Sequence, residues 1–244
     1  MSTSNKIREG INGFGRIGRN LFRLLLDHPD IEVVAINDVA DPHTLAHLLK
    51  YDSLHGVLHR NIKAQGERLF IDGKSYRVSS AKQPGEIDWT SEGVELVIES
   101  SGKFKTRELL EPHLQKGVRK VILSVPPQDE SIKMIVLGVN EHLLDGSETI
   151  ISNASCTTNN AGPMLKVIHD RFEVLEAYIT TVHSYTTDQS LHDQPHRDLR
   201  RARAAATGRR APRPDRDPLP RQSWSRRSGA LRPDPDPRAT RRTQ

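Results

Sequence analysis

The sequence contains a single cysteine among its 244 residues, which excludes an internal disulfide framework. Such sparse cysteine is typical of a reducing compartment, so we expect a cytoplasmic protein. No apolar run approaches the ~20 residues of a membrane-spanning helix, and the polar residues 1–5 do not start a signal peptide. The eleven histidines are scattered and have no cysteine partners at ligand spacing, so no metal site is predicted.

Lysine, glutamate, isoleucine, valine and phenylalanine are all absent from residues 207–244. This segment contains 11 Arg, 4 Asp and 7 Pro, so its net charge is +7 and the first 206 residues carry −2 of the whole chain's +5. Because the basic charge belongs to this tail, nucleic acid is an unlikely partner for the rest of the chain. With so few large apolar side chains the tail cannot offset its ordering entropy, and we predict disorder.

Strand-like and helix-like segments alternate from residue 6 to about residue 123. This alternation predicts βαβ units and therefore an α/β protein with a mostly parallel, doubly wound sheet of the Rossmann type. The predicted buried strands are 31–36, 94–98 and 118–123, and the predicted helices are 20–26 and 105–116, the second ending at Gly117.

The rest of the chain departs from this alternation. Residues 57–78 are strand-like around an Asp72-Gly73 turn, which predicts an antiparallel insertion. Further on, the pattern predicts strands at 134–138, 149–152 and 173–183, and a helix that begins at Ser155 or Thr157 and runs to about Asp170.

The segment Asn12-Gly-Phe-Gly-Arg-Ile-Gly18 fits the G-x-G-x-x-G pattern of dinucleotide-binding loops. Gly13 permits a tight turn, Gly15 lets the backbone approach a pyrophosphate, and Gly18 lets the following helix pack closely on its strand. The helix start favours phosphate groups through its free N–H groups and its dipole. Asp38 lies 20 residues after Gly18 at the end of the next strand, where a carboxylate accepts from ribose hydroxyls and repels a 2′-phosphate. The loop therefore predicts NAD as cofactor, and a ligand-free glycine turn is the alternative.

Glu9 conflicts with the buried strand that is expected to precede this loop. It stands between Ile7 and Ile11 on the face where an apolar residue is expected. An unpaired buried carboxylate is costly, so the sequence leaves two alternatives: Glu9 lies outside the buried stretch, or it finds a partner.

The only thiol, Cys156, stands at a predicted strand-to-helix junction, where a helix N-terminus favours the thiolate. His183 ends a later predicted strand, and an imidazole beside a cysteine is a recurring arrangement for a nucleophile. A buried inert cysteine is the alternative interpretation.

Four stretches of the sequence closely resemble the glyceraldehyde-3-phosphate dehydrogenase family, and the resemblance covers about residues 6–206. The stretches are Ile11-Asn-Gly-Phe-Gly-Arg-Ile-Gly-Arg19, Tyr51-Asp-Ser-Leu-His-Gly56, Ser152-Asn-Ala-Ser-Cys-Thr-Thr-Asn159 and His183-Ser-Tyr-Thr186. The resemblance implies that Cys156 attacks an aldehyde, that His183 acts as base during hydride transfer to NAD, and that inorganic phosphate cleaves the resulting thioester. For the binding sites it implies cofactor contacts from Asn12, Gly13, Gly15, Arg16, Ile17, Gly18, Asp38 and Ser101, and phosphate contacts from Ser155, Thr157, Thr186 and Arg203.

The resemblance also implies a domain organisation: an NAD-binding Rossmann domain (1–155), a partial α+β catalytic domain (156–206) and the basic tail (207–244). The family is homotetrameric, oxidises glyceraldehyde 3-phosphate in glycolysis and consumes inorganic phosphate. The match stops abruptly near Ala206, so we expect an incomplete catalytic domain, an out-of-frame tail and no turnover by the chain as it stands. A genuine basic extension is the alternative for the tail. Erythrose-4-phosphate dehydrogenase and a non-catalytic NAD-binding fragment are the alternative functions.

Overall fold

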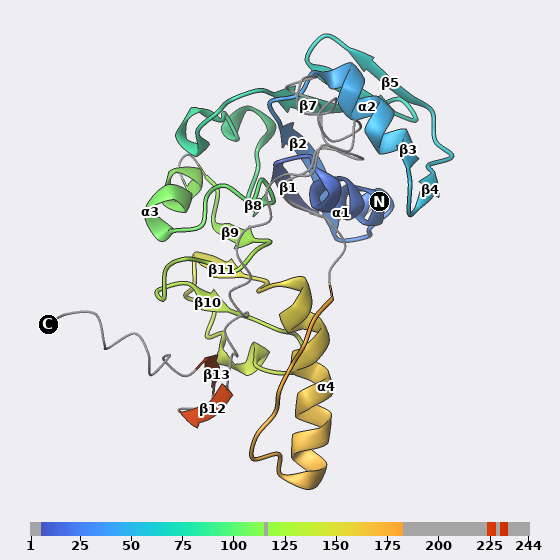
Figure 1. Cartoon of the computed structure of the whole chain (residues 1–244). Coiled ribbons are helices and arrows are strands. Elements are labelled where there is room, and N and C mark those ends of the chain that lie inside the picture. The colour runs from blue at the N-terminus through green and yellow to red at the C-terminus, as the bar shows by residue number, and fades with distance from the viewer. Residues whose placement is uncertain (1–5, 115–116, 183–223, 228–229, 234–244) are drawn as a thin grey trace, which may run out of the picture.

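The computed structural model describes residues 6–114, 117–182, 224–227 and 230–233. Its main feature is a nine-stranded sheet with the order β10-β11-β9-β8-β1-β2-β7-β6-β5 (Figure 1). The strands are β1 (Ile7–Asn12), β2 (Ile31–Asn37), β5 (Ile62–Gln65), β6 (Arg68–Ile71), β7 (Lys74–Ser79), β8 (Leu96–Glu99), β9 (Lys120–Leu123), β10 (Lys133–Met134) and β11 (Ile150–Ser152). The α-helices are α1 (Arg16–Leu25), α2 (Pro42–Lys50), α3 (Arg107–Leu110) and α4 (Cys156–Phe172).

Short elements complete the described part of the chain. A small ribbon pairs β3 (Tyr51–Asp52) with β4 (Gly56–Val57). The 3-10 turns are η1 (Pro84–Glu86), η2 (Thr90–Glu92), η3 (Glu111–Leu114) and η4 (Glu141–Leu143).

Strands β10 to β7 pair in parallel, which confirms the predicted doubly wound sheet. Beyond β7 the sheet continues through two antiparallel pairs, β7 with β6 and β6 with β5. The predicted insertion is therefore confirmed, and so is its turn: Asp72 and Gly73 join β6 to β7 with φ of 51° and 86°. Two successive positive φ values match the right-handed twist of a two-residue hairpin.

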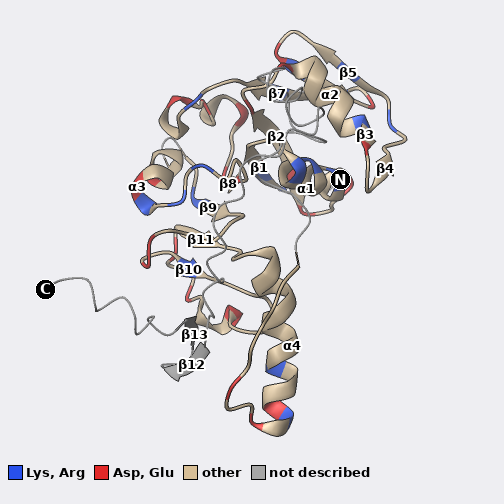
Figure 2. Ribbon diagram, viewed as in Figure 1, with Lys and Arg blue, Asp and Glu red and all other residues tan. Residues whose placement is uncertain are grey.

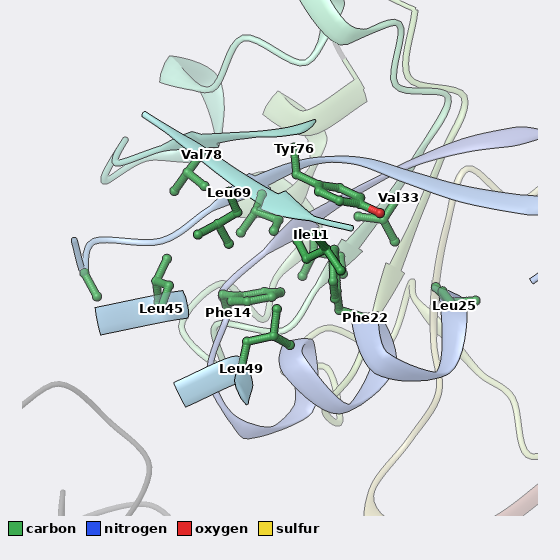
Figure 3. Packing of buried hydrophobic residues seen from close by; sticks show 13 residues of the cluster. Ile11, Phe14, Phe22, Leu25, Val33, Leu45, Leu49, Leu69, Tyr76 and Val78 are labelled. Atoms are coloured by element: carbon green, nitrogen blue, oxygen red, sulfur yellow. The ribbon is translucent and has the colours of Figure 1, made fainter. Parts of the chain in front are cut away.

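Each face of the sheet carries its own hydrophobic core. On one face α1 and α2 pack on the sheet, and Phe14, Phe22 and Tyr76 form successive edge-to-face ring pairs there (Figure 3). On the other face Trp89, Val121 and Leu110 of α3 belong to a second cluster. Covering both faces is what a parallel sheet requires, and it explains why the central strands are apolar on both sides.

The helix predicted for 105–116 is present only in part. Its first turn is α3, but the chain then tightens into the 3-10 turn η3, which contains Pro112. Proline lacks a backbone N–H and clashes with the preceding turn, so the α-helix does not continue through it. Gly117 has a φ of 102°, as expected for the residue that ends such a segment.

Two predicted strands are wrong within the described residues. The strand predicted for 134–138 stops at Met134, and a turn follows. Residues 173–182 of the strand predicted for 173–183 pair with no other strand in the part of the chain that the structure describes, and His183 lies outside that part. Strand propensity needs a neighbouring strand to become structure, and within the described part of the chain none lies beside these residues.

Within the tail, β12 (Trp224–Arg227) and β13 (Ala230–Pro233) pair antiparallel. The composition did not indicate regular structure here, and an isolated two-stranded hairpin is only marginally stable in water. The other residues of 207–244 lie outside the described part, so disorder of the tail stays a prediction.

Charged residues of both signs are spread over the described elements (Figure 2).

Helix α4 presents an apolar stripe to solvent. Val167 and Ile168 lie three and four residues after Met164, and Phe172 lies four residues after Ile168, which places the four side chains on one face. Their exposed fractions run from 47% to 76%. Beyond the helix, Leu175 is 97% exposed. Earlier in the helix, Gly162 packs against Val136 and Val139, so α4 meets the rest of the molecule through its first turns.

Candidate functional site

The strand order reverses between β1 and β8. After β1 the chain forms β2 beside it, continues at the outer strand β5, comes back inward through β6 to β7, and then crosses to the other side of β1 as β8. In an open parallel sheet, ligands bind where such a reversal leaves a crevice outside the carboxyl ends of the two strands. Here those ends are Asn12 and Glu99, paired in register. The topology therefore places a candidate ligand site over the loops that follow them.

The loop after β1 has the geometry of a phosphate-binding turn. Gly13 has a φ of 91°, and a Cβ there would stand 2.4 Å from the Ser101 backbone nitrogen. A Cβ on Gly18 would stand 2.2 Å from the Gly13 carbonyl oxygen, so only glycine allows this approach. A Cβ on Gly15 would meet nothing within 4 Å, so the reason for glycine there lies outside the protein's own packing. A ligand's close approach is such a reason.

Helix α1 starts directly from this loop. Its N-cap is Gly15, with no side-chain cap, so the first N–H groups of the helix remain available to an anion. Ile17 is 53% exposed in this first turn. Arg16 is partly buried, and the buried Arg19 donates from Nη1 to the Phe14 carbonyl at 2.9 Å. These features fit a dinucleotide pyrophosphate.

Asp38 follows β2 and contacts the glycine loop. Its Oδ2 accepts from the Phe14 N–H at 2.7 Å, and its Oδ1 accepts from the Ala40 N–H at 2.9 Å. Each carboxylate oxygen keeps a second lone pair, and the residue is only partly buried. A ribose hydroxyl could therefore donate to Asp38 without breaking either bond.

Asn12 and Ser101 are committed to contacts inside the protein. The Asn12 amide donates from Nδ2 to Glu99, and its Oδ1 accepts from Asn37 Nδ2 at 2.8 Å. The Ser101 N–H and hydroxyl both donate to Glu99 Oε1. That both residues contact the cofactor stays a prediction.

Cys156 is the first residue of α4 and is exposed. The predicted helix start at Ser155 is confirmed: Ser155 is the N-cap, and its Oγ accepts from the Thr158 N–H at 3.0 Å. Ala154, just before the cap, has a φ of 56°, an uncommon conformation for a residue with a Cβ. The turn out of β11 thus places the thiol in solvent at a helix N-terminus.

The glycine loop and the thiol lie at one edge of the sheet. Strands β1, β8, β9 and β11 are neighbours and all run parallel, so their carboxyl ends share an edge. Asn12 ends β1, Glu99 ends β8, and Ser152 ends β11 four residues before Cys156. The fold therefore brings a dinucleotide-type loop and an accessible cysteine to the same side of the molecule.

Part of the predicted site lies beyond the described residues. His183, Thr186 and Arg203 fall there, so their positions relative to Cys156 stay predictions. Ser155 and Thr157 are described and flank the thiol, both partly buried. Among the described residues, no group of three or more His, Cys, Asp or Glu side chains is placed to hold a metal ion. The described helices include none that is long and apolar enough to cross a membrane.

Three buried residues near the site escaped the sequence analysis: Trp89, Glu99 and His113. They form hydrogen bonds with one another behind the glycine loop. Trp89 and His113 were not predicted because they are separated in sequence from each other and from the glycine loop. An acidic residue that ends an apolar strand, two residues before Ser101, was a signal that could have identified Glu99.

Comparisons with known proteins agree with this geometry. The family model "Glyceraldehyde 3-phosphate dehydrogenase, NAD binding domain" matches residues 7–107, and that family's C-terminal domain matches residues 155–209. Glyceraldehyde-3-phosphate dehydrogenases of Geobacillus stearothermophilus and Thermotoga maritima are 52% and 51% identical over 201 residues, and the Bacillus subtilis enzyme 1 is 50% identical. In each case 82% of this chain aligns, and it spans 60% of the relative's length.

Proposed function

Since the chain belongs to the glyceraldehyde-3-phosphate dehydrogenase family, we propose that it binds NAD at the glycine loop and that Cys156 is the nucleophile of a phosphorylating aldehyde oxidation. The observation that carries this proposal is the shared edge of the sheet, where the loop after β1 and the N-terminus of α4 lie at the carboxyl ends of parallel strands. A thiol and a dinucleotide site on one edge are what hydride removal from a thiol-bound aldehyde requires.

In this proposal different residues hold the pyrophosphate and the adenosine ribose of the cofactor. The uncapped start of α1 and the backbone of Gly13 and Gly15 hold the pyrophosphate, and Asp38 accepts from the ribose hydroxyls. When bound, NAD supplies the hydride acceptor for the oxidation. The carboxylate of Asp38 repels a 2′-phosphate, so NAD is preferred over NADP.

The chain's own residues supply the covalent chemistry. His183 takes the proton of the Cys156 thiol, and the thiolate attacks the aldehyde carbon to give an oxyanion that N–H groups at the start of α4 stabilise. The oxyanion takes that proton back from His183, which gives the thiohemiacetal. His183 takes the proton of the thiohemiacetal hydroxyl as its carbon is oxidised to the thioester. Inorganic phosphate then attacks the thioester carbonyl, which releases the Cys156 thiolate and gives an acyl phosphate. Ser155, Thr157, Thr186 and Arg203 would hold the substrate and attacking phosphates.

Glyceraldehyde 3-phosphate is the aldehyde that we propose, with 1,3-bisphosphoglycerate as product. The relatives named above carry the name of the glyceraldehyde-3-phosphate enzyme, which favours this aldehyde over erythrose 4-phosphate. We extend to this chain the cytoplasmic location and the glycolytic role expected above, and a homotetramer as its assembly.

Calorimetric titration and thiol alkylation together test the proposal. NAD should bind the 244-residue chain more tightly than NADP. Iodoacetamide should modify one site per chain, because Cys156 is the only thiol, and faster than it modifies a cysteine in an unfolded peptide. The matched control, Cys156→Ser, should bind NAD and take up no label. Absent NAD binding, or a thiol no faster than the peptide's, would contradict the proposal. NADH formation from glyceraldehyde 3-phosphate and phosphate would show the full reaction and would contradict the expectation of no turnover.

A further inference from the structure

A line of buried hydrogen bonds runs behind the candidate cofactor site. Trp89 is 2% exposed, and Glu99 and His113 are fully buried. Trp89 Nε1 donates to His113 Nδ1 at 3.1 Å, and His113 Nε2 lies 3.2 Å from Glu99 Oε2. An indole nitrogen can only donate, so His113 Nδ1 accepts and the ring proton resides on Nε2. His113 is therefore a neutral imidazole whose tautomer is fixed by Trp89 and directs a donor at Glu99.

Glu99 collects four donors at the end of β8. Its Oε1 accepts from the Ser101 N–H at 2.8 Å and from the Ser101 hydroxyl. Its Oε2 accepts from the Asn12 amide and from His113 Nε2. Since all four neighbours donate, the group acts throughout as an acceptor, which is the role of a carboxylate. Its hydrogen bonds are charge-assisted and stronger than neutral ones.

The groups that Glu99 holds form the wall of the glycine loop. Asn12 directly precedes Gly13, and the Ser101 nitrogen lies 2.4 Å from where a Gly13 Cβ would stand. Ser100 Oγ also donates to the Gly13 carbonyl at 2.7 Å. With so little space between the two loops, a shift of Ser101 or Asn12 would displace Gly13 as well.

We propose that His113, oriented by Trp89, is a positioning residue for NAD: through Glu99 it holds the two strand ends that shape the glycine loop. His113 itself is buried and does not reach the ligand. The proposal rests on the function proposed above, because it assumes that the loop binds a dinucleotide. It assigns a role in cofactor affinity to a residue that lies 95 positions after Gly18, the end of the glycine motif.

Two substitutions of His113 separate positioning from simple core packing. Glutamine places an amide N–H near the position of Nε2, so His113→Gln keeps the donor to Glu99. Asparagine places its oxygen near Nδ1, so His113→Asn keeps the acceptor for Trp89 and loses the donor to Glu99. We expect His113→Asn to raise the Kd for NAD roughly tenfold, and His113→Gln to stay within about threefold of the unmodified chain.

The control is Val121→Ala, which opens a cavity in the same hydrophobic cluster and touches none of these hydrogen bonds. It should lower the unfolding temperature and leave the Kd for NAD unchanged. If His113→Asn does not fold, Trp89→Phe provides the second variant: it frees the His113 tautomer, so nitrogen NMR should detect protonated Nδ1 and calorimetry a weaker Kd.

The outcomes separate the two proposals. A folded His113→Asn chain that binds NAD like the unmodified chain would overturn the positioning role. An equal loss in Val121→Ala would overturn it too, since stability alone would then account for affinity. If the unmodified chain binds no NAD, the proposed function fails first, and the positioning role fails with it.

Discussion

Replacing Glu9 with valine should stabilise the protein, and more strongly at about pH 8 than at about pH 5. Glu9 is 2% exposed in β1, and its Oε1 has no hydrogen-bond partner. Its register partners are Val33 on β2 and Leu96 on β8. Both alternatives that the sequence left open are therefore excluded for Oε1: the residue is buried, and this oxygen is unpaired. Burial raises the pKa of Glu9 from 4.5 to about 7.

This pKa sets the direction and size of the effect. In the unfolded chain Glu9 loses its proton near pH 4.5, whereas in the folded chain it keeps the proton to about pH 7. The folded state thus binds more protons in this window, and stability is lost as the pH rises through it. At about 1.36 kcal/mol per pKa unit, the loss comes to about 3 kcal/mol by pH 8. That loss is a large part of the roughly 5–15 kcal/mol by which a folded domain is typically stable.

Urea unfolding at several pH values measures this effect. The matched control is Glu9→Gln, which keeps the size and polarity of the side chain but cannot titrate. The free energy of unfolding of the unmodified chain should fall relative to Glu9→Gln by about 3 kcal/mol between about pH 4.5 and pH 8. Glu9→Val should lie above Glu9→Gln at every pH, because it also removes the unpaired polar group. A difference between the chain and Glu9→Gln that does not change with pH would refute the reasoning.

Three further predictions concern the candidate site. Asp38→Ala should weaken NAD binding by roughly tenfold and abolish the preference for NAD over NADP, as parallel titrations would show. An unchanged preference would show that Asp38 does not bind the ribose. Ser155→Ala should lower the free energy of unfolding in urea by about 1 kcal/mol and slow the alkylation of Cys156, because α4 loses its N-cap. Equal alkylation rates would show that the cap does not affect the reactivity of the thiol. Gly18→Ala should abolish NAD binding even where circular dichroism reports a folded chain, since its Cβ would stand 2.2 Å from the Gly13 carbonyl; retained binding would contradict the loop geometry.

The sequence predicted the elements whose causes are local. The glycine loop, the Asp72-Gly73 hairpin turn and the Ser155 cap each depend on residues within a few positions of one another, and the structure confirms all three. The parallel sheet was also predictable, because apolar runs separated by helical segments leave few other arrangements.

The features that the sequence did not reveal depend on distant partners. Residues 173–182 have strand propensity, but among the described residues no strand lies beside them to accept their hydrogen bonds. Glu99 meets Asn12 across 87 positions and His113 across 14, a contact that becomes visible only when β1 and β8 are paired. Periodicity likewise indicated a continuous helix over 105–116, and Pro112 limited it to one α-helical turn.

Because of the apolar stripe on α4, the association state of the chain should depend on the protein concentration. Water wets Met164, Val167 and Phe172 poorly, and two chains that bring these stripes together release that water without any change of fold. Association of this kind grows with concentration, so dilute and concentrated solutions would contain different species.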